Sequence, residues 1–399
     1  MTTEVSTKRI SRRQRWVLLG LIVALAILAY QLSGMVASPG GPTGDYVEYW
    51  AAGRLNLIGG NPYAADQLLS MQRAADRKTE FQPMFYPPWT LALTMPLALF
   101  SYPISRLLWF ILCSAMILIA INWTWRLFGE PTQRRWPAWI ITFTFFPTII
   151  VLRMGQIGPV LLLGVAGFLH FEHKKRYLLA GAFVALLAIK PHVLYLICIS
   201  ILAWSIGRRR WKILGGGFIV LLSGTLTAMM FNPRVITQYL SATLAADSLL
   251  VFATPTFGSL LRLLLGFERT WLAFVPMLLG IFWLGLYGLR YRADWLWAKR
   301  MPLLLLVSVF TAPYGWSFDQ VVLLPVVLQA MIEVLATNRV RIVSGAIFSY
   351  LMFNIAAFAL NGRVSDFWQF WMAPVLLIWA HLTHRLSMHA AETMKPVSS

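Results

Sequence analysis

Acidic residues and cysteines are scarce in this chain. Asp and Glu occupy 15 of the 399 positions, against 34 for Lys and Arg, so the formal net charge is +19. Charged residues make up 12% of the sequence and hydrophobic residues 58%, whereas a soluble domain carries about 25% charged residues. This composition excludes an ordinary soluble domain. Both cysteines, Cys113 and Cys198, lie in apolar stretches, so we expect neither a disulfide nor a metal site from them.

Long apolar runs fill most of the sequence instead. They recur from residue 17 to residue 384, which predicts an all-α protein that crosses a membrane many times. The first run, residues 16–36, follows the basic stretch KRISRRQR. It is longer than the apolar core of a signal peptide, which spans roughly 7–15 residues, and no Ala-x-Ala site follows it. We therefore expect a retained membrane helix.

Short basic clusters separate the apolar runs and carry most of the positive charge. Nucleic-acid binding would also favour basic residues, but clusters between spans are typical of the cytoplasmic loops of membrane proteins. The pattern predicts about twelve crossings in one integral membrane domain, residues 1–399, without a nucleic-acid partner. The cytoplasmic ends are expected at residues 1–15 and 385–399, and the outer segments at residues 37–86 and 232–270.

One apolar run does not fit this topology. Five runs separate the first two cytoplasmic clusters, although an even number is required if both clusters lie inside. The run at 87–101 is short and contains three prolines, and the sequence around residues 153–159 is broken by glycine and proline. Irregular backbone at membrane depth is tolerated only where protein buries it or water reaches it. Either one of these two regions does not span and borders a cavity, or one of the runs is miscounted as a helix.

Polar and ionisable residues gather at the predicted outer ends of the spans. Such residues cost several kcal/mol near the membrane unless they are paired or hydrated, so each is a functional candidate. Carboxylates and cations on one side of the membrane could bind an anion and transfer a proton. The residues are Asp45, Glu48, Arg153, Gln156, Lys190, His192 and Asp319.

Structural interpretations of the same residues remain open. Asp45 and Glu48 have the spacing of a helix capping box, a role compatible with catalysis because a cap fixes the position of the carboxylate. Lys190 and His192 could extend to the membrane interface. Asp319 could be a turn residue, and the tryptophans near it could belong to an interfacial belt.

Five stretches of the sequence occur in the order found in a known family. They are GDYVEYWAAGRLNLIGGNPY, FYPPWTLALTMPLALF, RMGQIGPVLLLGVAGFL, AGAFVALLAIKPHVLYL and TAPYGWSFDQVVLLP. Over about residues 40–330 they resemble glycosyltransferase family 87, whose best-known members are polyprenyl-phosphate-mannose-dependent mannosyltransferases of the GT-C superfamily. The most specific feature is Asp-x-x-x-Tyr at 45–49 followed by Gly-x-Pro-Tyr at 60–63.

The resemblance implies a fold, a reaction and a set of site residues. The fold is a GT-C-like bundle of membrane helices in the cell (plasma) membrane, with juxtamembrane helices on its periplasmic or extracellular face. On that face, a hexose, normally mannose, would pass from a polyprenyl-phosphate carrier to a glycolipid or glycan acceptor, without a cofactor or metal. Asp45 is then the catalytic base. Substrate contacts are expected from Glu48, Tyr49, Arg54, Tyr63, Arg153, Gln156, Lys190, His192, Trp316 and Asp319.

The expected mechanism is an inverting transfer, in which Asp45 deprotonates the acceptor. Lys190, with His192 or Arg153, would hold the leaving phosphate. The sequence departs from the family in one place, because many members carry a histidine pair after the late Ser-Trp, and here the stretch at 316–320 is WSFDQ. This departure leaves open both the identity of the sugar and contact between this loop and the phosphate. Two other functions stay open, a secondary transporter with a midplane site and a non-catalytic partner in envelope-glycan assembly.

Overall fold

The structure is a computed structural model that describes residues 44–75, 81–129, 135–245 and 249–392. Within these ranges the chain is helical, with no β-strand, which confirms the predicted all-α membrane fold. The expected first span, residues 16–36, lies outside the described residues. The α-helices are α2 (Tyr46–Leu57), α3 (Ala65–Ala75), α4 (Leu91–Ala98), α5 (Tyr102–Phe128), α6 (Trp136–Thr144), α7 (Phe146–Met154), α8 (Gly158–His173), α9 (Tyr177–Val184), α10 (Tyr195–Gly207), α11 (Trp211–Phe231), α12 (Val235–Ala245), α13 (Phe257–Leu265), α14 (Val275–Tyr291), α15 (Trp297–Thr311), α16 (Leu324–Ala336), α17 (Val340–Leu360) and α18 (Met372–Glu392). Short 3₁₀ helices connect them: η1 (Pro88–Thr90), η2 (Ala185–Ile189), η3 (Leu249–Val251), η4 (Thr270–Phe274), η5 (Ser317–Leu323) and η6 (Asp366–Gln369).

Several of these helices match the thickness of a membrane. Five are long and apolar enough to cross it within the described part of the chain, or six if the bent pair α6–α7 counts as one span. Two further apolar segments, Tyr177–Ile189 and Tyr195–Gly207, are shorter. The five long spans are Tyr102–Phe128, Trp211–Phe231, Thr270–Tyr291, Ser317–Ala336 and Val340–Leu360.

The topological misfit noted in the sequence corresponds to two irregular regions. Helix α4, the helical part of the run at 87–101, has eight residues and is about 12 Å long, against about 30 Å for the hydrocarbon core, so it cannot span alone. The pair α6–α7 bends by 65°, and Pro147 in the first turn of α7 cannot donate a backbone hydrogen bond. The Phe146 amide freed by the break donates to Oδ1 of Asn354 on α17 at 2.7 Å.

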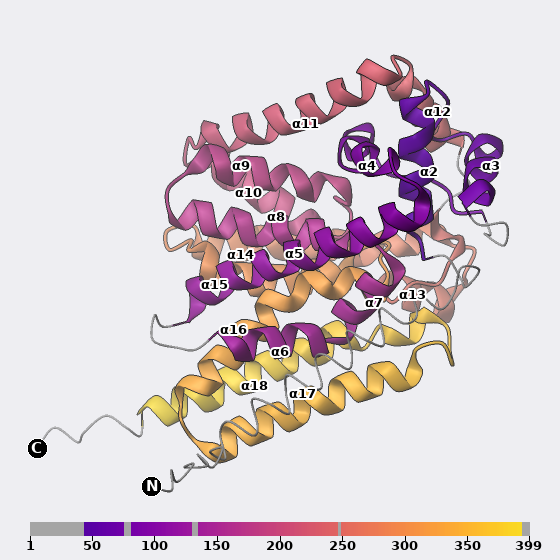
Figure 1. Cartoon of the computed structure of the whole chain (residues 1–399). Helices are drawn as coiled ribbons and strands as arrows, with labels where there is room; N and C mark the ends of the chain where they lie inside the picture. Colours follow the sequence, from indigo (N-terminus) through magenta and orange to yellow (C-terminus); the bar gives the residue numbers. More distant parts are fainter. Residues whose placement is uncertain (1–43, 76–80, 130–134, 246–248, 393–399) are drawn as a thin grey trace, which may run out of the picture.

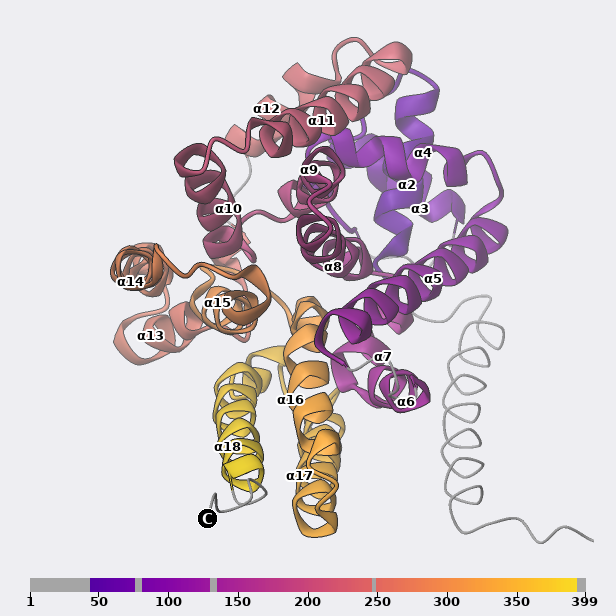
Figure 2. The same cartoon turned by 90° about the vertical axis from the view of Figure 1, so that its left-hand side faces the viewer.

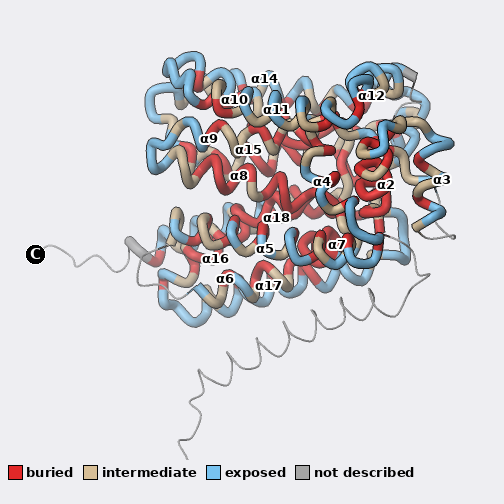
Figure 3. Tube along the Cα trace, turned by 45° about the horizontal axis from the view of Figure 1, so that its top comes forward, coloured by how far each residue is buried: buried red, intermediate tan, exposed pale blue. Residues whose placement is uncertain are grey.

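The helices form an elongated bundle with a distinct cap at one end. In Figure 1 most of the long helices lie side by side, while α2, α3, α4 and α12 gather at the right-hand end. Figure 2 shows the same bundle nearly along its axes, with α8 inside it. Helix α8 packs against α5, α9 and η5, and α2 packs against α3, α4 and α5. Figure 3 shows how deeply both α2 and α8 are buried. Helix α8 is apolar nearly all round, as expected for a buried helix, whereas α2 also buries the polar Glu48 and Asn56.

Candidate active site

Asp45 begins α2 and is held by a side chain from the turn between α7 and α8. Gln156 Nε2 donates to Asp45 Oδ2 at 2.5 Å. Gln156 Oε1 in turn accepts hydrogen bonds from Tyr49 and Tyr86, at 2.8 and 3.4 Å. Asp45 occupies the N-cap position but its side chain caps no amide, so the capping-box interpretation is wrong. The Asp45 carboxylate is half-buried. It is held by the side-chain amide of Gln156, whose oxygen is in turn held by the two tyrosines.

Two glycines explain why the GDY and MGQ stretches meet. A Cβ at Gly44 would lie 2.5 Å from the Met154 carbonyl oxygen. A Cβ at Gly155 would lie 2.7 Å from the Cβ of Tyr46, and the φ of Gly155 is +70°, which disfavours any other residue. Trp109 Nε1 donates to the Gly155 carbonyl at 2.7 Å, and its ring stacks on Tyr46 with centroids 5.4 Å apart. Close backbone contact therefore places Gln156 beside Asp45.

We expect Gly155→Ala to destabilise the protein by about 1–3 kcal/mol and to slow the reaction, because it adds both backbone strain and a steric overlap with Tyr46. Gly285→Ala is the matched control, since a Cβ there meets nothing within 4 Å and helix propensity favours alanine by about 0.5–1 kcal/mol. Thermal unfolding in detergent measures both variants. Equal stability for the two would contradict the proposed close packing.

Lys190 and Asp319 form a buried ion pair at the same end of the bundle. Lys190 follows η2 and Asp319 lies in η5, with Nζ and Oδ1 separated by 2.8 Å and exposures of 5% and 1%. The ammonium also lies over the rings of Tyr86 and Phe318, at 5.4 and 5.1 Å from their centroids. The second oxygen of Asp319 accepts the Trp316 amide at 3.0 Å. Lys190 therefore does not extend to the membrane interface, and Asp319 serves as both a turn cap and an ion-pair partner.

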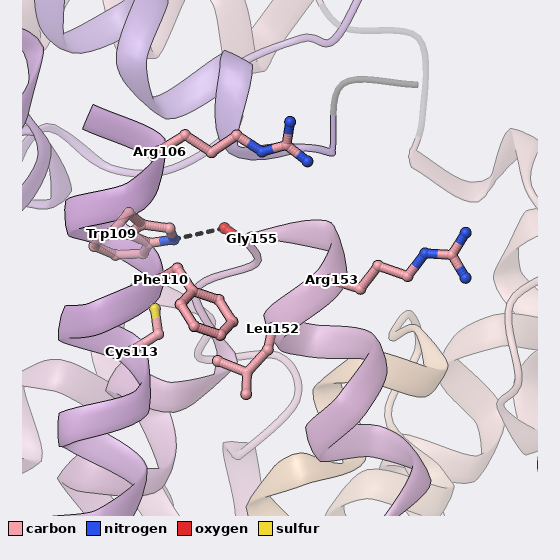
Figure 4. Close-up of a pocket in the computed structure, with 7 residues that line it drawn as sticks. All are labelled: Arg106, Trp109, Phe110, Cys113, Leu152, Arg153 and Gly155. Atoms are coloured by element: carbon pink, nitrogen blue, oxygen red, sulfur yellow. Dashed lines mark hydrogen bonds between the residues drawn. The ribbon is translucent and has the colours of Figure 1, made fainter. Parts of the chain in front are cut away.

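A hollow adjoins this cluster between α5 and α7. It is a small, partly open hollow lined by Arg106, Trp109, Arg153 and Gly155, with apolar side chains beneath them. Figure 4 shows the hydrogen bond from Trp109 to Gly155 and the two arginine side chains, which extend in the same direction in this view. Gly155 precedes Gln156, so the hollow and the Asp45 cluster share a wall.

Comparison with known proteins identifies the family of the chain. A sequence model described as glycosyltransferase family 87 matches residues 84–315, more than half of the chain. The chain belongs to glycosyltransferase family 87. No curated protein and no solved structure matches it. The matched range contains Tyr86, Gln156 and Lys190 of this glycosyltransferase, whereas Asp45 lies before it and Asp319 just beyond it.

The charged groups of the glycosyltransferase cluster act on one another. Burial raises the pKa of Asp45 above its usual value, while the Gln156 hydrogen bond and Lys190 oppose the rise. Burial raises the pKa of Glu48 well above the ordinary range, and the charge of Asp45 adds to this. Burial acts to lower the pKa of Lys190, but Asp319 and Tyr86 together outweigh burial, and the pKa is raised. Burial therefore favours the protonated form of both carboxyl groups, while Asp319 and Tyr86 favour the charged form of Lys190.

Two residues expected to contact substrate lie beside the cluster without joining it. Tyr63 donates to the Tyr86 carbonyl at 3.0 Å and packs on Tyr239 with ring centroids 5.4 Å apart, so it supports the segment carrying Tyr86. Arg54 donates to the Ala98 carbonyl at 3.0 Å. It lies nine residues beyond Asp45 on α2, a rise of about 13 Å. Both stabilise the framework around the site.

His192, Trp316 and Arg153 lie at the border of the cluster. The His192 ring is 5.9 Å from that of Tyr314, and Trp316 Nε1 donates to the Tyr314 hydroxyl at 2.7 Å. Burial, with Lys190 adding to it, lowers the pKa of His192 to about 4, so this imidazole is neutral near pH 7 and cannot replace Lys190 as a cation. Arg153 is exposed and lines the hollow.

Sequence reasoning missed two residues. Tyr86, in the FYPPWT stretch, hydrogen-bonds Tyr49 at 2.9 Å and contacts Lys190, and it joins the Asp45 and Lys190 halves of the site. Asp366 accepts the Ser317 amide at 2.9 Å and its hydroxyl at 2.6 Å, which fixes the start of η5. The only sequence signal for Asp366 was the scarcity of acids.

Proposed function

We propose that this glycosyltransferase transfers a hexose, with mannose as the first candidate, from a polyprenyl-phosphate carrier to a glycolipid or glycan acceptor at the outer face of the cell membrane. The observation that supports this most is that a half-buried carboxylate, Asp45, and a buried ammonium, Lys190, lie at the same end of a bundle of apolar helices. A donor carried by a lipid reaches such a site from within the membrane.

The proposed chemistry is a single displacement. The acceptor hydroxyl gives its proton to Asp45, and its oxygen attacks the anomeric carbon of the donor. The bond from that carbon to the phosphate oxygen breaks, its electron pair stays on the phosphate, and attack from the opposite side inverts the configuration. Gln156 occupies Oδ2 of Asp45, and Oδ1, to which no described residue is bonded, is free for the acceptor. General-base catalysis of this kind contributes about 10²–10⁴-fold.

Lys190 supports the base electrostatically. Its positive charge opposes the effect of burial on the pKa of Asp45, and so favours the ionised carboxylate that the reaction needs. The same charge favours the negative charge that develops on the departing phosphate, since fixed cations act strongly where solvent is excluded. Asp319 and the Tyr86 ring hold the ammonium in position.

Transfer should be lost as the pH falls through the pKa of Asp45, because only the ionised carboxylate accepts a proton. Burial raises this pKa, so the acid limb of kcat/KM is expected above about pH 4, the usual value for aspartate. Gln156→Met removes a hydrogen bond that lowers the pKa, so its limb should move to higher pH. Initial rates over a pH series measure this shift. The distant control Gln329→Met should leave the acid limb unmoved. If the acid limb of Gln156→Met were also unmoved, Asp45 would not be the titrating base.

The direct test is transfer by purified protein in nanodiscs. Polyprenyl-phosphate-linked mannose, glucose and arabinose are offered with a panel of glycolipid acceptors, and products are detected by mass spectrometry. We expect transfer from one donor with inversion at the anomeric carbon. Folded protein that transfers none of them contradicts the proposal, and sugar movement across proteoliposomes without transfer would favour a transporter.

A further inference from the structure

We infer that two basic turns, at the end of the bundle opposite Asp45, together bind the phosphate headgroup of an anionic phospholipid. One turn is EHKKR, residues 172–176, at the junction of α8 and α9, and the other is RRRWK, residues 208–212, at the junction of α10 and α11. They hold seven Lys and Arg residues against one acid, Glu172. This site is independent of the proposed sugar transfer.

Helix lengths place both turns far from the candidate active site. Helix α8 begins two residues after Gln156, and its 16 residues rise about 24 Å to His173. Helix α10 begins five residues after Lys190, and its 13 residues rise about 20 Å to Gly207. In Figure 1 the helices α9, α10 and α11 reach the left-hand end of the bundle, away from α2. The turns therefore lie at the opposite end from the Asp45 cluster.

The two turns lie side by side and form one surface. The guanidinium of Arg210 lies over the ring of Tyr177, 4.4 Å from its centroid. Behind the turns, α9 and α11 are in close backbone contact, because a Cβ at Gly181 would overlap the Ile213 carbonyl oxygen. The basic side chains of both turns are exposed, so their charges add over a shared surface.

Both turns place a cation where the backbone favours glycine. Lys175 and Arg209 have φ angles of 57° and 53°, in the left-handed region. In each turn the next amide bonds the carbonyl five residues back, Arg176 to Phe171 at 2.8 Å and Arg210 to Ser205 at 2.7 Å. This is the pattern that ends a helix with a left-handed residue, which is usually glycine.

The same pattern occurs twice elsewhere in the chain, and there the left-handed residue is glycine. Gly59 and Gly155 follow α2 and α7 with φ angles of 74° and 70°, and the next amide again bonds the carbonyl five residues back, at 2.9 and 3.0 Å. A lysine or arginine at such a position costs stability relative to glycine. Backbone strain that persists points to a function, and what the two residues add here is positive charge.

The position of the turns favours a lipid over a soluble anion. The membrane span α11 begins at Trp211, and the apolar segments Tyr177–Ile189 and Tyr195–Gly207 begin and end at the same turns. The basic residues therefore lie at the level of the headgroups. Trp211 and Leu178 beside them are 58% and 49% exposed, which offers apolar surface to the acyl chains. Basic clusters between membrane helices bind anionic headgroups in this way.

The experiment measures binding of phosphatidylglycerol to the full-length protein in detergent by native mass spectrometry. The test variant is Lys175→Gly/Arg209→Gly, which removes two charges and the backbone strain together. It should bind about 10- to 30-fold more weakly, since each Lys or Arg near an anionic surface strengthens binding by about fivefold. Its Tm should equal or exceed that of wild type, because glycine favours the left-handed conformation. Unfolding would then not explain the lost binding.

Two controls separate this site from a diffuse attraction between basic protein and anionic lipid. Arg341→Gln/Arg385→Gln removes two exposed charges from α17 and α18, and it should bind like wild type. Asn338 has a φ of 53° and is the third left-handed residue other than glycine among the described residues. Asn338→Gly removes that side chain without changing charge and should also bind like wild type.

Two further probes identify the ligand. Phosphatidylcholine with the same acyl chains should bind far more weakly, and inorganic phosphate at equal concentration should not displace phosphatidylglycerol. The site is overturned if wild type does not bind phosphatidylglycerol, if the test variant binds as tightly as wild type, or if the arginine control loses as much binding. Equal binding of phosphatidylcholine would exclude recognition of charge, and displacement by inorganic phosphate would assign a soluble anion in place of a lipid. A lower Tm for the test variant would contradict the strain at Lys175 and Arg209.

Discussion

Asp45→Asn is expected to slow sugar transfer by about 10²–10⁴-fold, the usual contribution of a positioned base. Asparagine has nearly the same shape and can still accept the Gln156 hydrogen bond, which in the native protein joins Nε2 to Oδ2 at 2.5 Å. It cannot take a proton from the acceptor. The loss should therefore appear in kcat, with donor binding and Tm close to those of wild type, because the variant changes charge and leaves packing intact.

The matched control is Asp66→Asn, an exposed acid on α3 within the same expected outer segment. It removes the same charge without touching the cluster, so its rate should equal that of wild type. Steady-state transfer assays in nanodiscs compare the two variants. If folded Asp45→Asn retained the normal rate, the base would be another group, and a non-catalytic role for the protein would become the better hypothesis.

Lys190→Met is expected to cost about 3–5 kcal/mol of unfolding free energy, because it leaves the Asp319 carboxylate buried without a counter-ion. Adding Asp319→Asn should restore most of this stability, since asparagine is neutral and can still accept the Trp316 amide. Activity should stay low in the double variant, by about 10²-fold, because the positive charge that supports Asp45 and the leaving phosphate is gone. The double variant should thus regain stability without regaining activity, which separates the two effects of Lys190.

Denaturant unfolding in detergent and transfer rates test this pair. Arg300→Met is the control, because Arg300 and Asp294 form an ion pair at 3.7 Å in which Asp294 is exposed, and such pairs contribute about 0–1 kcal/mol. A double variant as active as wild type would limit Lys190 to a structural role. If Lys190→Met alone were as stable as wild type, the buried Asp319 carboxylate would not depend on Lys190 as its counter-ion.

Local sequence patterns predicted the helices and several members of the site, but not how those members connect. Apolar length predicted a helical membrane protein, although the described residues hold five or six candidate spans and not the expected twelve. The rarity of polar residues near the spans identified Asp45, Gln156, Lys190 and Asp319. The partners could not be predicted, because Lys190 and Asp319 are 129 residues apart and their pairing depends on how η2 packs near η5. The capping-box prediction failed for the same reason, since the distant Gln156 competes for the Asp45 carboxylate.

Tyr86 shows a different limit of sequence reasoning. A tyrosine between two apolar stretches in a chain with 13 tyrosines carries no signal of its own. Its importance arises from geometry, because its hydroxyl contacts Tyr49 and its ring lies against Lys190. For Arg54, the charge near the motif predicted substrate contact, and the sequence could not predict that its guanidinium donates to the carbonyl of Ala98 at the end of α4.

The two hydrogen bonds that Ser317 donates to Asp366 limit which segments can be exchanged between members of the family. Asp366 lies beyond residue 315, where the family match ends, yet it anchors the turn that carries Asp319. The segment between α17 and α18 thus helps to hold a turn of the candidate site. A chimera that imports α17 and α18 from another glycosyltransferase should work only when the imported segment brings its own carboxylate for the serine.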